Sequence, residues 1–131
     1  MVSQVQNAGL DIITAALHAY ASRPRYLGWG TGSGQAVTDT DLDSQTGTNE
    51  ARVAGTSSQQ TTNTANDTYR VTGTISAGGA RAITELGVFD AAGAGTPPSG
   101  GNMGLYGDFS VINLATGDSI AFTVNVVFDQ A

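Results

Sequence analysis

The first part of the chain carries apolar residues at helical spacing. Four of them recur three and four residues apart, namely Leu10, Ile13, Leu17 and Tyr20. This period predicts an amphipathic α-helix from about Asn7 to Ala21, with Asn7 as a candidate N-cap. Arg23-Pro24 should end the helix, because proline cannot continue it. We therefore expect residues 1–25 to form an N-terminal arm and helix, with His18 partly exposed outside the apolar stripe.

After Pro24 the pattern changes to short segments in which apolar and polar residues alternate. Alternation with a period of two predicts half-buried β-strands, and the glycine-rich stretches between them predict turns. The clearest case is the last segment, where Ile120, Phe122, Val124 and Val126 alternate with small or polar residues. The candidate strands are residues 26–29, 51–57, 69–75, 82–90, 104–111 and 119–128.

The order of these elements defines the expected fold class. One helix followed by short strands predicts a mainly β protein, an antiparallel β-sandwich or small barrel with one N-terminal α-helix. The length of 131 residues suits one domain, so we expect residues 1–131 to form a single unit, with the β-sandwich at 26–131. The polar run 57–67 is predicted to be a long loop or a mobile β-arm. Residues 91–102 are predicted to be a flexible Gly/Pro/Ala loop.

Charge and composition exclude several classes of function. Charged residues make up only 12%, the net charge is −6, and the basic residues are five arginines with no lysine. Nucleic acids and anionic membranes are bound by clustered positive charge, so we expect neither as a partner. The chain has no cysteine and a single histidine, which excludes thiolate metal sites, multi-histidine sites and the usual nucleophilic triads. We therefore predict no enzyme activity, no catalytic residues, no cofactor and no metal.

Two loop motifs invite a chemical interpretation. The glycine run from Gly28 to Gly34 lacks the lysine and the helix start of a phosphate-binding loop, so we predict a strand-to-loop transition. The acidic segment Asp39–Asp43, with Glu50 further on, has carboxylates at calcium-loop spacing. Ser44 stands where that loop needs glycine. We therefore predict a solvated acidic turn anchored by Leu42, with calcium binding as the alternative.

Paired carboxylates are the last chemical candidate. Glu85 together with Asp90 or Asp108 could supply the acid and base of a glycosidase. Glu85 lies in an apolar segment, where a buried charge needs a partner. We therefore predict a structural ion pair between Glu85 and one of three arginines, with catalysis by these carboxylates as the alternative. The candidate arginines are Arg52, Arg70 and Arg81.

Five segments, in order along the chain, resemble small virion proteins of tailed bacteriophages. They are Tyr26–Gly32, Asp39–Asp43, Glu50–Arg52, Ile83–Asp90 and Leu114–Val124, and together they extend over most of the chain. The group includes head decoration (cement) proteins. The segment Ile83–Asp90 is also similar to parts of tail-fibre and tail-collar proteins. None of these segments is a catalytic signature.

The resemblance implies a structural role in a virion, with a capsid decoration protein favoured over a tail-fibre, collar or adaptor component of the tail. The expected partners are the major capsid protein and further copies of the chain itself, in a homotrimer. The expected location is the outer surface of the capsid, after synthesis in the host bacterial cytoplasm. Arg23 and Arg25, beside Pro24 at the predicted helix exit, are the candidate partner-interface residues, facing acidic surface on the shell.

Overall fold

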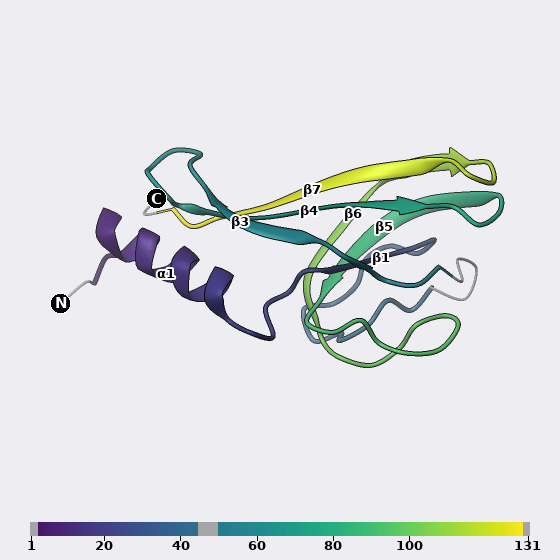
Figure 1. Cartoon of the computed structure of the whole chain (residues 1–131), viewed down its shortest axis with the longest axis horizontal. Coiled ribbons are helices and arrows are strands. Elements are labelled where there is room, and N and C mark those ends of the chain that lie inside the picture. Colours follow the sequence, from purple (N-terminus) through teal and green to yellow (C-terminus); the bar gives the residue numbers. More distant parts are fainter. Residues whose placement is uncertain (1–2, 45–49, 130–131) are drawn as a thin grey trace.

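The computed structural model describes residues 3–44 and 50–129, and it confirms the predicted fold class (Figure 1). One N-terminal helix, α1 (Asn7–Ala19), precedes the strands. The strands are β1 (Tyr26–Gly30), β2 (Val53–Ala54), β3 (Thr56–Gln60), β4 (Thr68–Ser76), β5 (Arg81–Phe89), β6 (Met103–Leu114) and β7 (Ser119–Val127). Each predicted strand segment therefore contains a strand, and the segment 51–57 divides at Gly55 into β2 and the start of β3.

The strands form two antiparallel sheets stacked as a sandwich. Sheet A has the order β2-β1-β5-β6, and sheet B has the order β3-β4-β7. Figure 1 shows the sheets as two layers, with α1 at one end beside β3. The chain passes from sheet A to sheet B twice, at Gly55 and in the turn between β6 and β7. In that turn Gly117 has a φ of 89°, a left-handed conformation that glycine adopts without strain.

Helix α1 packs on sheet B through one face. Leu10 and Thr14 are buried, and Leu17 packs against the core between the sheets. The Thr14 hydroxyl donates a hydrogen bond to the backbone oxygen of Asn66 (2.6 Å), and it accepts one from the Gln59 amide (2.9 Å). The helix is therefore attached to β3 and to the following turn by polar contacts as well as by apolar packing.

The ends of α1 differ slightly from the prediction. Gln6 takes the N-cap position, so the predicted cap at Asn7 is wrong by one residue. The helix ends at Ala19, and the Tyr20 side chain beyond it is 61% exposed. Tyr20 therefore does not continue the buried stripe, because the last helical turn stops before it.

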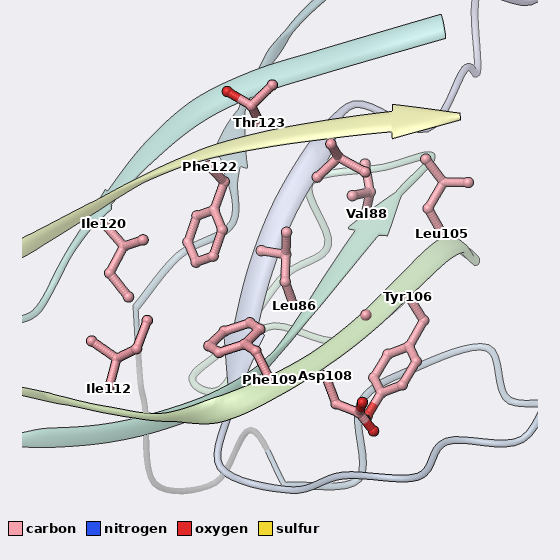
Figure 2. A pocket seen from close by; sticks show the side chains of 12 residues that line it. Leu86, Val88, Leu105, Tyr106, Asp108, Phe109, Ile112, Ile120, Phe122 and Thr123 are labelled. Atoms are coloured by element: carbon pink, nitrogen blue, oxygen red, sulfur yellow. The ribbon is translucent and has the colours of Figure 1, made fainter. Parts of the chain in front are cut away.

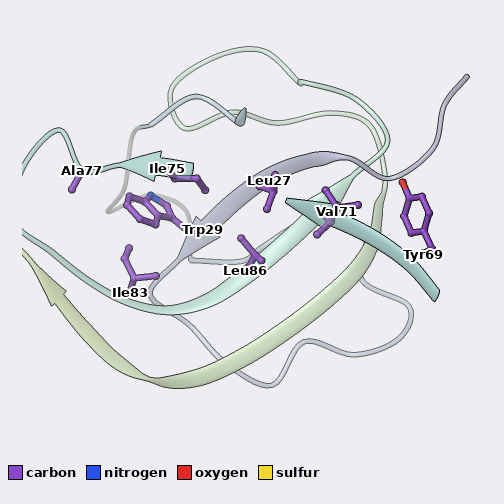
Figure 3. Close-up of a cluster of buried hydrophobic side chains, with 9 residues drawn as sticks. Leu27, Trp29, Tyr69, Val71, Ile75, Ala77, Ile83 and Leu86 are labelled. Atoms are coloured by element: carbon purple, nitrogen blue, oxygen red, sulfur yellow. The ribbon is translucent and has the colours of Figure 1, made fainter. Parts of the chain in front are cut away.

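The core lies between the two sheets. Its buried residues are Leu27, Trp29, Tyr69, Val71, Ile75, Ala77, Ile83, Leu86 and Val88 (Figure 3). Alternate residues of β4 face this core, as a period of two predicts. Leu42, the predicted anchor of the acidic turn, is also buried.

The two sheets pack closely around Leu27, on the side of β2 and β3. A Cβ atom added at Gly55 or at Gly73 would lie 2.6 Å from the Leu27 Cδ1 atom, closer than real Cβ contacts. Leu27 belongs to sheet A and Gly73 to sheet B, so the missing side chain on one sheet leaves room for the leucine of the other. We call this side of the sandwich, marked by Leu27, Gly55 and Gly73, the closed side.

Residues 57–67 divide into a strand segment and a turn, so the predicted loop covers only their second part. Their first part belongs to β3, which pairs with β4. The turn that follows is held by the buried Asp67 carboxylate. This carboxylate accepts hydrogen bonds from the Thr68 hydroxyl and from the backbone N–H groups of Thr62, Asn63 and Thr64. These donors, with the Thr68 hydroxyl the strongest, hold the pKa of Asp67 well below its ordinary value.

Candidate assembly interface

The two sides of the sandwich have different edges. On the closed side, β2 is only two residues long, and β3 packs against α1. On the opposite side, β6 has twelve residues and β7 has nine, and neither strand pairs with another strand along its outer edge within the described residues. Long unpaired edges expose backbone N–H and C=O groups that can pair with another chain. We call this side, formed by β6 and β7, the open side.

An apolar cleft of about 350 Å³ lies between β6 and β7 on the open side. Figure 2 shows Phe109 and Ile112 of β6 pointing towards Ile120 and Phe122 of β7. The ring centroids of Phe109 and Phe122 are 6.2 Å apart. All four side chains face inwards but stay partly exposed, whereas the inward residues of β1 and β4 are buried. The hydrophobic core is therefore covered on the closed side and reaches the solvent on the open side.

The open side carries almost no charge. Strand β7 contains no charged residue, and β6 contains only Asp108. Figure 2 shows Asp108 pointing away from the cleft, and its carboxylate accepts a hydrogen bond from the Gly34 N–H (3.1 Å). Free proteins usually protect edge strands with charged side chains or proline, and β7 has neither. The open side thus has the composition of a surface that other protein covers.

The outer face of sheet A holds a buried carboxylate. Glu85 is 0% exposed, and it accepts hydrogen bonds from the Gly32 N–H (3.2 Å) and from the Tyr106 hydroxyl (3.1 Å). Burial, together with this carboxylate, raises the pKa of Tyr106. The partners of Glu85 are thus a backbone N–H and a phenol, and the predicted ion pair with an arginine is wrong. Each carboxylate oxygen of Glu85 thus has one donor, the Gly32 N–H for Oε1 and the Tyr106 hydroxyl for Oε2.

Glu85 also accounts for the glycine run. A Cβ atom at Gly30 would collide with the Glu85 carboxylate, and one at Gly32 would lie 3.1 Å from the Glu85 Oε1 atom. Strand β1 ends at Gly30, so the run is the predicted strand-to-loop transition. The glycines let the loop after β1 cross directly over a buried acid.

The carboxylates that could form a glycosidase site accept hydrogen bonds from other groups of the fold. Asp108 lies 3.5 Å from the Tyr106 hydroxyl, so it shares this hydroxyl with Glu85. Asp90 lies apart from them and accepts a hydrogen bond from the Asn102 N–H (2.7 Å). Sheet A brings Glu85 and Asp108 together in its register but leaves Asp90 at the far end of β5.

Arg52 joins the acidic turn to the loop after β5. Its side chain is 0% exposed. The guanidinium donates to the Asp41 carboxylate (3.1 Å) and to the backbone oxygens of Ala91 (3.2 Å) and Gly100 (2.6 Å). It also stacks on Phe89, with 3.5 Å between the guanidinium carbon and the ring centroid. Burial lowers the pKa of Arg52, and the charge of Asp41 opposes this effect.

Residues 91–102 form a loop, as predicted, and defined contacts hold this loop in place. Besides the two bonds from Arg52, the backbones of Ala94 and Ser99 exchange hydrogen bonds of 2.9 and 3.0 Å. These contacts have no signal in the local sequence, because the acceptors in the loop are backbone oxygens and the arginine that binds them lies far from the loop in the chain.

Glu50 connects β1 with β5 through its side-chain contacts. It accepts hydrogen bonds from the Trp29 indole (3.0 Å) and the Gly78 N–H (2.8 Å), and it forms an ion pair with Arg81 (3.0 Å). Burial opposes ionisation of Glu50, but these three donors outweigh it and lower the pKa. Glu50 binds Arg81 and Asp41 binds Arg52, so these two acidic residues of the calcium-loop alternative have different partners. Within residues 3–44 and 50–129, no three His, Asp or Glu side chains are grouped to hold a metal ion.

Arg23 and Arg25 lie where the chain leaves α1. Arg23 donates to the Ser57 hydroxyl (2.7 Å), which also contacts Nδ1 of His18 (2.9 Å). Arg25 donates to the Tyr26 hydroxyl (3.0 Å) and lies over its ring, 4.6 Å from the centroid. Both arginines are half-buried, and their role at a partner interface stays a prediction. His18 is partly exposed, as predicted, and takes part in docking the helix on β3.

The sequence pattern did not reveal the open side. Alternation at Ile120, Phe122 and Val124 predicts an inward face, but it does not tell whether another layer covers that face completely. The signal that the sequence does contain is the near absence of charge from two successive strands, β6 and β7.

Comparisons of the chain with protein-family models, with curated proteins and with solved structures found no match. In the part of the chain that the structure describes, no helix is long and apolar enough to cross a membrane.

Proposed function

We propose that this chain is a structural protein of a tailed-phage virion, and that it acts as a capsid decoration (cement) protein that binds and stabilises the assembled head shell. The observation that carries this proposal is the open side, where an uncharged apolar cleft lies between two unpaired edge strands. Such a surface favours assembly with other protein. The resemblance of five segments to small phage virion proteins supports the virion as the place of assembly.

The segments that carry the resemblance contact one another in the fold. Glu50 connects Trp29 in β1 with Arg81 in β5. Arg52 connects the acidic turn at Asp41 with Phe89 and the loop that follows it. Four of the five segments are thus connected through sheet A and its loops, and the fifth, Leu114–Val124, leads from β6 into β7 of sheet B.

The proposed mechanism is thermodynamic. A protein that binds the assembled shell and not its separate subunits shifts the equilibrium towards the intact shell. Repetition over a symmetric shell multiplies a modest free energy per contact into a large total. The proposed partners are the major capsid protein and other copies of this chain in a homotrimer, on the outer surface of the capsid.

The exit of α1 is the proposed contact with the shell. Arg23 and Arg25 place two positive charges there on a chain whose net charge is −6, and they would meet acidic groups of the major capsid protein. The nearby Tyr20 side chain is 61% exposed, and its backbone oxygen accepts a hydrogen bond from Arg23 (3.1 Å). Together these residues offer apolar area bordered by positive charge, the composition typical of a protein-binding patch.

The copy number of this chain in purified virions tests the proposal. Quantitative mass spectrometry, referenced to the major capsid protein, should give a number close to that of the capsid protein or a simple fraction of it. A far lower number, matching a single ring, would contradict the head assignment and support the alternative of a tail-fibre, collar or adaptor component. Absence from the virion would overturn both.

A further inference from the structure

We infer that the open side is a self-association interface, in which β7 of one copy pairs with the exposed part of β6 of the next copy and the apolar clefts are closed between them. This inference deepens the proposed function and rests on it, because it assigns the surface through which the copies of the proposed trimer meet. The occupant of the cleft is then a second copy of this chain.

The two edges of one copy complement each other. The start of β6 already has a backbone partner in the acidic turn, since the Met103 N–H donates to the backbone oxygen of Thr40 (2.9 Å). The stretch Phe109–Leu114 and the whole of β7 have no strand partner on their outer edges in the described part of the chain. If β7 pairs with a neighbour's β6, a closed ring leaves neither edge exposed. Pairing between two β7 strands would leave β6 unpaired.

The distribution of charge favours a second copy over a foreign protein. Copies of a chain with net charge −6 repel each other across most of their surfaces. The open side is an exception, because β7 has no charged residue and Asp108 of β6 is turned away from the cleft. Two copies of an acidic chain therefore need an uncharged surface to meet without strong repulsion. A foreign partner has no such requirement and would gain specificity from an acidic patch.

The exposed side chains supply the driving force. Ile112 of β6, which lines the cleft, is 38% exposed although it is a large apolar residue. Phe109 and Phe122 are also partly exposed at the cleft. Removing this area from water is favourable by roughly 25 cal/mol per Å², and the strand hydrogen bonds fix the register of the contact.

The test is the mass of the purified full chain in solution, measured by light scattering after size exclusion. The wild type should have three times the mass of one chain. Ile112→Glu should be a monomer, because it places a charge in the cleft at a position that tolerates a polar group in the single copy. Ile12→Glu is the matched control, since it makes the same substitution on the exposed face of α1, and it should keep the wild-type mass.

A monomeric wild type would overturn the inference, and so would a folded Ile112→Glu variant that keeps the wild-type mass. Hydrogen–deuterium exchange of the wild type covers the case in which Ile112→Glu does not fold. Amides of β7 should exchange slowly in concentrated samples and faster after dilution, and equal rates would overturn the inference. A wild-type monomer with a high copy number on the shell would leave the proposed function standing, so the two failures are distinguishable.

Discussion

Two residues in one short segment, Glu50 and Arg52, hold sheet A and its loops together. They lie two positions apart and point to different partners, Glu50 to Trp29 and Arg81, and Arg52 to Asp41 and the loop 91–102. The guanidinium supplies several fixed donors from one buried side chain, which a lysine would not match. At this scale, the charged groups of Glu50 and Arg52 bind other groups of the same chain.

Replacement of Arg52 tests this role. Arg52→Met should lower the free energy of unfolding by about 3 kcal/mol, because it removes a buried guanidinium that donates to the Asp41 carboxylate and to the backbone oxygens of Ala91 and Gly100. The matched control is Arg70→Met, at a residue of β4 whose side chain bonds to Asn125 in an exposed position. The control should change the stability by no more than about 0.5 kcal/mol. Urea unfolding measures both, and equal effects would contradict the assignment.

Asp67 should make stability depend on pH in the acid range. Its pKa in the folded chain is lowered, mainly by the Thr68 hydroxyl and also by three backbone N–H groups. The ionised carboxylate therefore stabilises the fold above the unfolded pKa of about 3.9, and this stabilisation is lost as the pH falls below that value. Asp67→Asn should be less stable than the wild type at neutral pH, and the difference should shrink below about pH 4.

The measurement is urea unfolding of the wild type and of Asp67→Asn over a series of pH values. Two pH profiles that stay parallel through the acid range would show that Asp67 does not carry this dependence.

At the scale of elements, the sandwich has one tight side and one wide side. Gly55 and Gly73 let the sheets meet around Leu27 on the closed side. On the open side, the aromatic rings of Phe109 and Phe122 stand between β6 and β7, and an apolar cleft remains. Small residues at one side and large residues at the other thus set the shape of the space between the sheets.

Two glycine substitutions compare these sides. Gly55→Ala should destabilise the fold by about 1–3 kcal/mol, since the new Cβ would lie 2.6 Å from Leu27 Cδ1 and 2.8 Å from the backbone oxygens of Arg25 and Thr72. Gly107→Ala, in β6, is the control, because nothing lies within 4 Å of the new atom. It should change stability by less than about 0.5 kcal/mol. Thermal unfolding measures both, and a tolerated Gly55→Ala would contradict the tight packing.

Segments with regular alternation or a continuous apolar run could be predicted as strands from the sequence, whereas the polar part of β3 could not. Strands β4 and β7 follow from their apolar residues at every second position. Strand β3 (Thr56–Gln60) has no such pattern, and its buried Ser57 is satisfied by Arg23 and His18 from the helix end. Long-range partners of this kind decide the structure of a polar segment, and local sequence does not encode them.

The candidate site was less predictable than the fold. The chemical candidates of the sequence, from the glycine run to Glu85, turned out to serve internal packing and hydrogen bonding. The open side exists because the side chains between β6 and β7 are not fully covered. This coverage depends on how the two sheets pack. Only the missing charge on these strands pointed to it.

At the scale of the whole molecule, we propose two surfaces for assembly. The open side, between β6 and β7, suits contact with further copies of the chain. The exit of α1, with Arg23 and Arg25, suits contact with a larger acidic partner. A protein with one surface for its own copies and another for a shell can bind a symmetric particle at many equivalent places.

The most direct test of this account is binding of the purified chain to expanded head shells that lack it. The account predicts saturable co-sedimentation with the shells, a rise in their dissociation temperature, and no binding to unassembled capsid subunits. Equal binding to subunits and shells, or binding that leaves the dissociation temperature unchanged, would contradict a role in stabilising the assembled head.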